Sequence, residues 1–322
     1  MSSLPLSPVT DHMPTCVLIT CARNEEIHIG LLLECVLAQT VTPRKWIIAS
    51  DGSTDRTDDI VREYAGRHPW IELLCVPERG PRDFASKVYA FNAAYDRIRS
   101  LDFDIIGNLD ADLTFGNDYL EYLLRQFSQC QQLGVAGTPF VEDSSIVYNY
   151  QFTNIEHVSG GCQLFRRACF EAVGGFPPIK GGGEDWVAVT TARMRGWRTR
   201  TFTERHFVHH RKMGQAATTM LRARLNDGRN DYLFGNHPLW ELSRALYQLQ
   251  KRPYLIGSFM LLYGYLKPLA LGEPRPIAAE LMAFTRREQL QRLKSTFGKL
   301  LAFFWDKKRR SPHVLPPVAI SP

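Results

Sequence analysis

Two aspartates stand one residue apart at the end of an apolar run, in the sequence Leu109-Asp110-Ala111-Asp112. The run before them, residues 103–108, has the composition of a buried strand. Because side chains alternate along a strand, Asp110 and Asp112 point the same way and converge on one object at its carboxyl end. Carboxylates presented in this way bind a hard divalent cation shared with a diphosphate. The same pattern is common in solvated turns, so it needs support from elsewhere in the chain.

Four other polar segments carry side chains that suit this chemistry. They occupy residues 20–26, 51–57, 87–92 and 181–186. Each also has a plain structural interpretation, as a turn, a helix cap or a solvated helix face. Their meaning therefore depends on whether the fold brings them together.

Strand and helix patterns alternate through the first part of the chain. Apolar β-type runs lie at 16–20, 46–50, 71–76 and 103–109, with helical spacing between them at 27–39, 57–64 and 85–97. This rhythm predicts an α/β fold with a mostly parallel sheet covered by helices on both faces. Ligands bind such sheets at the carboxyl ends of the strands, where 20–26, 51–57 and the aspartate pair fall.

The composition supports one large or two modest folded domains. Of 322 residues, 44% are hydrophobic and 22% charged, so the chain can bury a substantial core. The net charge of +6 suits an anionic ligand or an acidic membrane surface. The 7 cysteines include no C-x-x-C pair, which indicates free thiols in a reducing compartment. Residues 1–13 contain prolines without a signal-peptide pattern and predict a disordered leader.

Helix formers, arginines and aromatics dominate the C-terminal part. We expect a catalytic domain over 14–212, a helical, membrane-associated region over 213–305 and a basic, proline-rich tail over 306–322. The apolar segment 254–271 is shorter than the roughly 20 residues of a membrane span, which favours an in-plane or re-entrant helix over a crossing. The alternative is a core-facing helix. Residues 251–310 hold 13 basic and 4 acidic residues, a net +9 that favours an anionic leaflet.

Taken in order, the motifs resemble those of the family 2 glycosyltransferases, which have the GT-A fold. The resemblance covers residues 14–212 and implies a Rossmann-like, mostly parallel sheet flanked by helices. The matching segments are Asn24-Glu25-Glu26, Asp51 to Thr57, Ser86 to Asn92 without the family's leading glycine, Asp110-Ala111-Asp112, Ser159-Gly160-Gly161, Arg166-Arg167, Val173 to Phe176 and Glu184-Asp185.

The resemblance implies a nucleotide-sugar site at the ends of the first strands. Asp51 would accept a hydrogen bond from the base, Lys87 would lie near the diphosphate or the base, and Asp110 would meet ribose or sugar hydroxyls. The full expected set is Thr20, Ala22, Arg23, Glu25, Asp51, Ser53, Lys87, Asn92, Asp110 and Ala111.

The resemblance also implies a metal site and a general base. Asp112 would hold Mn²⁺ or Mg²⁺, with His210 preferred to His209 as a further ligand, and the cation would neutralise charge on the diphosphate leaving group. Both histidines have an alternative interpretation as ordinary residues at a strand end. Asp185 matches the family's general base, Glu184 is the second candidate, and in-line attack would invert the anomeric centre. The expected acceptor residues are Gly160, Gly161 and Trp186.

Two departures from the family pattern refine this expectation. Cys21-Ala22-Arg23-Asn24 stands where many members have Pro-x-Tyr-Asn, so an aromatic that would stack on the base is missing. The chain also lacks the Q-x-x-R-W signature of processive synthases. We therefore expect one sugar to be added per encounter.

The expected function is an inverting, metal-dependent glycosyltransferase of exopolysaccharide or related surface-glycan synthesis. Its partners would be a nucleotide-sugar donor, above all a UDP-sugar, a lipid-linked or oligosaccharide acceptor, and the anionic inner face of the cell membrane, with no nucleic acid. One alternative is a nucleotidyltransferase, although residues 20–26 lack the glycine-rich loop typical of that class. Another is an inactive sugar-binding relative, although Asp110, Asp112 and Asp185 are intact. No G-x-G-x-x-G follows the first strand, which argues against a dinucleotide enzyme.

Overall fold

The computed structural model describes residues 12–77, 84–142, 145–146, 154–179, 181–211 and 220–309. The chain divides into two compact units, Met1–Ala216 and Ala217–Pro322. The expected leader lies almost wholly outside the described residues, as does the tail beyond residue 309. The first unit combines strands and helices, whereas the described part of the second is built from helices.

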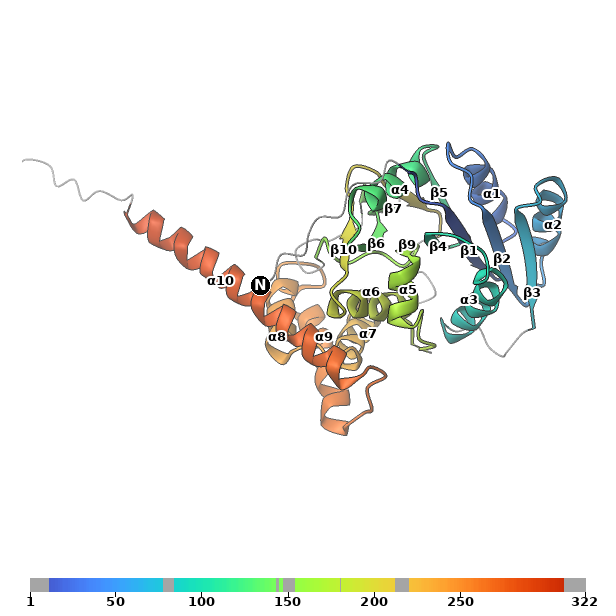
Figure 1. The fold of residues 1–322 in the computed structure, drawn as a ribbon. Helices are drawn as coiled ribbons and strands as arrows, with labels where there is room; N and C mark the ends of the chain where they lie inside the picture. Colours follow the sequence, from blue (N-terminus) through green and yellow to red (C-terminus); the bar gives the residue numbers. More distant parts are fainter. Residues whose placement is uncertain are drawn as a thin grey trace, which may run out of the picture. The chain divides into compact units, whose positions relative to one another are not determined.

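A seven-stranded sheet forms the centre of the first unit (Figure 1). Its strands, in spatial order, are β10 (Arg198–Thr201), β6 (Leu133–Gly137), β9 (Cys162–Arg166), β4 (Ile105–Leu109), β1 (Cys16–Ala22), β2 (Lys45–Asp51) and β3 (Ile71–Val76). All neighbours pair in parallel except β9, which runs antiparallel to β4 and β6. The predicted mostly parallel α/β sheet is therefore confirmed.

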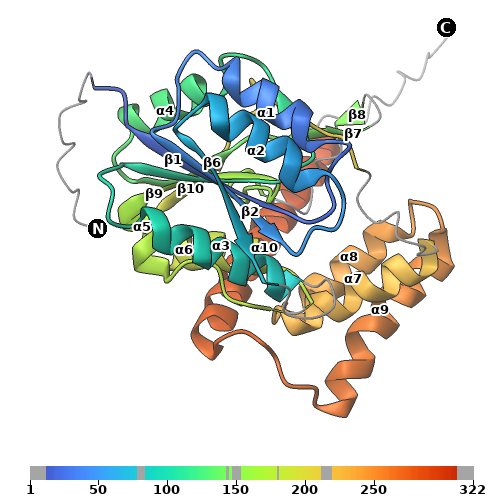
Figure 2. The same cartoon turned by 90° about the vertical axis from the view of Figure 1, so that its right-hand side faces the viewer.

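Helices cover both faces of this sheet, as Figure 2 shows. One face carries α1 (Ile29–Leu37), α2 (Thr57–Arg67) and α4 (Tyr119–Gln129), and the other carries α3 (Phe84–Ile98), α5 (Arg167–Val173) and α6 (Glu184–Met194). The alternation of β1 explains the two layers, since Leu18 packs into the first core and Val17 and Ile19 into the second. Because apolar side chains on both faces are buried, the strands read as continuous hydrophobic runs.

A smaller sheet begins just after β4 in the chain path. It contains β5 (Leu113–Phe115), β11 (Phe207–His209), β7 (Phe140–Glu142) and β8 (Ser145–Ile146), in that order. β11 pairs antiparallel with β5, and His209 faces Leu113 across the ladder. This pairing brings a histidine from far along the sequence next to Asp112.

The second unit contains α7 (Met220–Leu233), α8 (Pro238–Gln248), α9 (Tyr254–Leu271) and α10 (Ala279–Arg309). α9 packs against both α7 and α8. The Ser258 hydroxyl donates a hydrogen bond to the carbonyl of Ala245, and Tyr265 donates one of 2.7 Å to the carbonyl of Asn236. Among the described helices, α9 alone has the length and apolar composition of a possible membrane span.

Candidate active site

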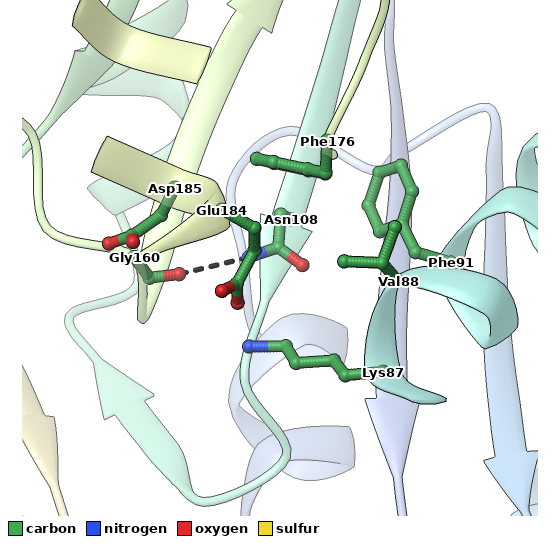
Figure 3. A pocket seen from close by; sticks show the side chains of 8 residues that line it. All are labelled: Lys87, Val88, Phe91, Asn108, Gly160, Phe176, Glu184 and Asp185. Atoms are coloured by element: carbon green, nitrogen blue, oxygen red, sulfur yellow. Dashed lines mark hydrogen bonds between the residues drawn. The ribbon is translucent and has the colours of Figure 1, made fainter. Parts of the chain in front are cut away.

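The site forms where the carboxyl ends of neighbouring strands meet the start of α6. β4, β1 and β2 are adjacent in the sheet, so the residues that follow them share one edge. A pocket at this edge is lined by Lys87, Val88, Phe91, Asn108, Gly160, Phe176, Glu184 and Asp185 (Figure 3). Four of the predicted site residues thus line one pocket although the chain separates them widely.

Asp110, Asp112 and His209 form a group suited to a divalent cation. One ligand atom from each lies within 4.8 Å of the others. Asp112 is buried, and the backbone amide of Asp110 donates a hydrogen bond of 2.8 Å to the carbonyl of Gly161, which fixes the turn after β4. Two carboxylates and one imidazole are donors that fit Mn²⁺ or Mg²⁺, with the imidazole favouring Mn²⁺.

The structure places His209, rather than the expected His210, beside the aspartates. His209 Nε2 lies 3.6 Å from Asp112 Oδ1, and its Nδ1 lies 3.4 Å from Glu142 Oε1 on β7. His210 Nε2 instead lies 2.9 Å from the hydroxyl of Thr114. His210 follows the last residue of β11, and its backbone amide donates a hydrogen bond of 3.0 Å to the carbonyl of Asp112.

Lys87 links the metal-ligand group to the pocket. Its Nζ lies 2.6 Å from Asp110 Oδ1. Burial by itself would lower the pKa of the Lys87 ammonium, but the carboxylates of Asp110 and Glu184 outweigh it and raise the pKa above its usual value. Lys87 therefore stays cationic, and Figure 3 shows its amino group directed toward Glu184.

Glu184 and Asp185 open α6 after a turn that requires glycine. Gly182 and Gly183 have φ of 84° and 89°, a left-handed conformation that side chains disfavour. Burial, followed by the neighbouring Asp185 charge, raises the pKa of Glu184 to about 7. Among the described residues, Glu184 Oε2 has no hydrogen-bond partner. A Cβ on Gly160 would collide with Asp185 Oδ2, so this position must be glycine for the carboxylate to lie where it does.

The loops after β1 and β2 hold one another in place. Asn24, with φ of 55°, accepts a hydrogen bond of 2.8 Å from the amide of Thr54 through its side-chain oxygen. The Ser53 hydroxyl accepts one of 3.2 Å from the amide of Asn24. Arg23 Nη1 lies 3.6 Å from Asp51 Oδ2. The expected nucleotide residues Arg23, Asp51 and Ser53 therefore lie together in two loops that are held to each other by these contacts.

Other predicted residues have mainly structural surroundings. Thr20 is fully buried, and its hydroxyl accepts a hydrogen bond of 3.0 Å from the indole nitrogen of Trp46. Its side chain therefore satisfies a polar group of the core. Asn92 is exposed on α3, about 140° around the helix from Lys87. Glu25 accepts a hydrogen bond of 2.6 Å from Arg211. Of the remaining predicted residues, Ala22 and Ala111 are buried, and Gly161 and Trp186 are half-buried.

Several residues of the site escaped the sequence-based predictions. Asn108 precedes the aspartates and donates a hydrogen bond of 2.9 Å to the carbonyl of Gly160, as Figure 3 shows. Glu142 contacts Nδ1 of His209, the ring nitrogen that does not face Asp112. Arg211 Nε lies 3.9 Å from Asp112 Oδ2. The preference for His209 over His210 could have been found only from the register of β11 against β5, which no local pattern reveals.

A comparison with protein families decides the classification. Residues 17–174 match the model of "Glycosyl transferase family 2". This segment is a family 2 glycosyltransferase domain. It contains β1 to β4, the aspartate pair and the Gly160-Gly161 turn, and the predicted family is confirmed.

Curated relatives of this domain include polysaccharide synthases. The chain is 27% identical over 137 residues to the poly-β-1,6-N-acetyl-D-glucosamine synthase of Staphylococcus epidermidis, covering 42% of this chain and 31% of that protein. It is 26% identical over 117 residues to the hyaluronan synthase of Pasteurella multocida, covering 36% of this chain and 11% of that protein. The chain thus spans less than a third of the length of these relatives.

Solved structures show the same fold. The mannosyltransferase PcManGT from Pyrobaculum calidifontis, in complex with GDP-Man and Mn²⁺, superposes with a TM-score of 0.55 at 19% identity, covering 93% of this chain and 84% of that one. TarS 1–349 from S. aureus, in complex with UDP-GlcNAc, gives 0.51 at 15% identity, covering 84% and 78%. The family 2 domain therefore has the GT-A fold.

Proposed function

We propose that this protein is an inverting, metal-dependent glycosyltransferase that transfers a sugar from a nucleotide-sugar donor to a hydroxyl of a glycan acceptor. One observation carries the proposal: Lys87 bonds Asp110 of the metal-ligand group and lines the same pocket as Glu184 and Asp185. A cation that can bind a diphosphate, Lys87, and carboxylates that can accept a proton from a hydroxyl, Glu184 and Asp185, therefore line the same pocket. The family 2 domain supports the same reaction class.

The donor half would use the strand edge and the metal-ligand group. Asp110, Asp112 and His209 would hold Mn²⁺ or Mg²⁺, which when bound offsets the negative charge that develops on the nucleoside-diphosphate leaving group. Asp51, buried beside Arg23, would accept the base N–H, and the cationic Lys87 would face the diphosphate. A UDP-sugar is the donor we favour. Structural neighbours bind GDP-Man or UDP-GlcNAc.

The acceptor half would depend on Asp185. Its carboxylate would take the proton of the acceptor hydroxyl while the hydroxyl oxygen bonds the anomeric carbon and the bond to the diphosphate breaks, which inverts the centre. Its position against Gly160 places the carboxylate at the wall of the pocket, away from Lys87 (Figure 3). Glu184 is the second candidate, because a pKa of about 7 suits a base at neutral pH, but it faces Lys87. Gly160, Gly161 and Trp186 would border the acceptor.

The acceptor we propose is a lipid-linked glycan or an oligosaccharide at the inner face of the cell membrane. The relatives in S. epidermidis and P. multocida are polysaccharide synthases, and the C-terminal segment from 251 to 310 is strongly basic. Without the Q-x-x-R-W signature, we expect one sugar per encounter.

Donor binding and hydrolysis test this function. With Mn²⁺, UDP or GDP should raise the melting temperature of the wild type and leave that of Asp112→Asn unchanged, because a bound ligand stabilises the folded state by mass action. The wild type should also hydrolyse UDP-GlcNAc, UDP-glucose or GDP-mannose slowly, with water as acceptor, and release the nucleoside diphosphate UDP or GDP. No melting shift with either nucleotide would contradict the proposal. Pyrophosphate release from a nucleoside triphosphate and a sugar phosphate would show a nucleotidyltransferase instead.

A further inference from the structure

α9 turns its most apolar face outward. Leu255 is 75% exposed, Ile256 61%, Phe259 65% and Leu266 51%. The buried face of the same helix combines the small residues Gly257, Ser258 and Gly264 with Leu261, Tyr265 and Pro268. A surface helix of a water-exposed domain has the opposite arrangement, with its apolar stripe toward the core. The outward face of α9 therefore requires an apolar covering.

The orientation of α9 is fixed by backbone contact with α7. A Cβ added at Gly228 of α7 would collide with the carbonyl oxygen of Leu261, and one added at Gly264 of α9 would collide with that of Leu225. The two helices therefore approach so closely that only glycine fits at both points. Because this contact uses the small-residue face, α9 cannot rotate to bury its apolar face within the unit.

α8 adds a second exposed apolar stripe. Leu239, Leu242, Leu246 and Leu249 are between 39% and 57% exposed. Their spacing of three, four and three residues places them on one side of the helix. The stripe reaches the turn into α9, where the exposed residues 254–256 continue it along the chain. Single exposed leucines are ordinary, but a run of this size marks an interaction surface.

The exposed charges on α8, on α9 and in the turn between them are of one sign. Within residues 239–271, all of which are described, the exposed charged residues are Lys251, Arg252 and Lys267, and the single acid, Glu241, is buried. Anionic lipid headgroups complement such a basic rim, and the acyl chains beneath them complement the leucine stripes.

We propose that α8 and α9 form a membrane-docking surface that lies in the plane of an anionic bilayer, with Leu255, Ile256, Phe259 and the α8 stripe inserted among the lipids. The proposal concerns the second unit alone and does not depend on glycosyl transfer.

The packing of α9 argues for this in-plane position rather than a crossing. Its 18 residues reach about 27 Å, short of a hydrocarbon core of about 30 Å. α7 is locked to it by the glycine contact and exposes Arg222, Asn226, Arg229 and Asn230. A crossing would carry these polar side chains into hydrocarbon, which is strongly unfavourable. An in-plane helix pair keeps them in water.

Vesicle flotation of the full-length protein tests the surface. The wild type should float with vesicles of phosphatidylcholine and phosphatidylglycerol, and more weakly with phosphatidylcholine alone. Leu255→Gln/Ile256→Gln/Phe259→Gln should lose at least about tenfold in partitioning, because its apolar contacts are gone. The matched control is Ile27→Gln/Leu31→Gln, which changes exposed apolar residues of the first unit and should float like the wild type. Circular dichroism melting verifies that each variant is folded.

A second measurement separates docking from crossing. Alkaline carbonate should strip the wild type from the vesicles, whereas a spanning helix would resist it. Equal flotation of the triple variant and the wild type, or resistance to carbonate, would overturn the proposal. The melting shift produced by UDP and Mn²⁺ should be the same in the triple variant and the wild type. Failure of docking and failure of donor binding are therefore distinguishable.

Discussion

At the scale of single residues, the chemistry turns on two adjacent carboxylates with different surroundings. Asp185 lies against Gly160, while Glu184 is buried beside Lys87. Asp185→Asn should lower kcat by about 10²–10⁴-fold, the contribution typical of a positioned general base. The affinity for UDP with Mn²⁺, measured by calorimetry, should not change, because Asp185 lies outside the metal-ligand group.

Glu184→Gln is the matched comparison for this prediction. It removes the neighbouring carboxylate with the same conservative change. If Glu184→Gln abolishes transfer and Asp185→Asn does not, the base is Glu184. A loss of UDP binding in Asp185→Asn would instead place that residue on the donor side.

Glu184 also predicts a pH dependence of stability. Its pKa is raised from 4.5 to about 7 in the folded protein, so between these values the folded state binds more protons than the unfolded state. The free energy of unfolding therefore falls as pH rises through this window, by up to about 3 kcal/mol from this group. Glu184→Gln should be more stable than the wild type at pH 8, with the difference shrinking toward pH 5. Urea titrations at both pH values measure it, and a difference that stays constant would rule out Glu184 as the titrating group.

At the scale of secondary-structure elements, strand order explains how much of the site the sequence could predict. The carboxyl ends of β1, β2 and β4 were predictable because long apolar runs mark buried parallel strands. β5, β7 and β11 have only three residues each, too few for a periodic pattern. The choice between His209 and His210 depends on the register of β11, which the sequence does not reveal. The resemblance to the family favoured His210, which the structure places at Thr114.

The α7–α9 contact gives a prediction at this scale. Gly264→Ala would place a Cβ against the carbonyl oxygen of Leu225, so the helices must separate and the free energy of unfolding should fall by about 1–3 kcal/mol. Hydrogen exchange should accelerate in α7 and α9. The control Gly298→Ala on α10, where a Cβ meets nothing within 4 Å, should be neutral or up to about 1 kcal/mol stabilising. Equal effects of the two changes would refute the close approach.

At the scale of the whole molecule, the chain combines a GT-A domain with a helical unit of a different character. Alternating strand and helix patterns predicted the first, and the fold is confirmed. Composition predicted helices in the second, but not which face of α9 would be buried. The buried face of α9 is set by Gly228 and Gly264, which allow α7 and α9 to approach closely. The hydrophobic pattern of one helix contains no information about such a contact between two helices.

Binding of Mn²⁺ in the presence of UDP, followed by electron paramagnetic resonance, tests the central claim most directly. We predict that the wild type binds the ion and that Asp112→Asn and His209→Ala each weaken binding by roughly 10–100-fold or more. His210→Ala, one residue away but bonded to Thr114, should bind like the wild type. Unchanged binding in Asp112→Asn, or a loss in His210→Ala with none in His209→Ala, would contradict the metal-ligand group on which the proposed reaction depends.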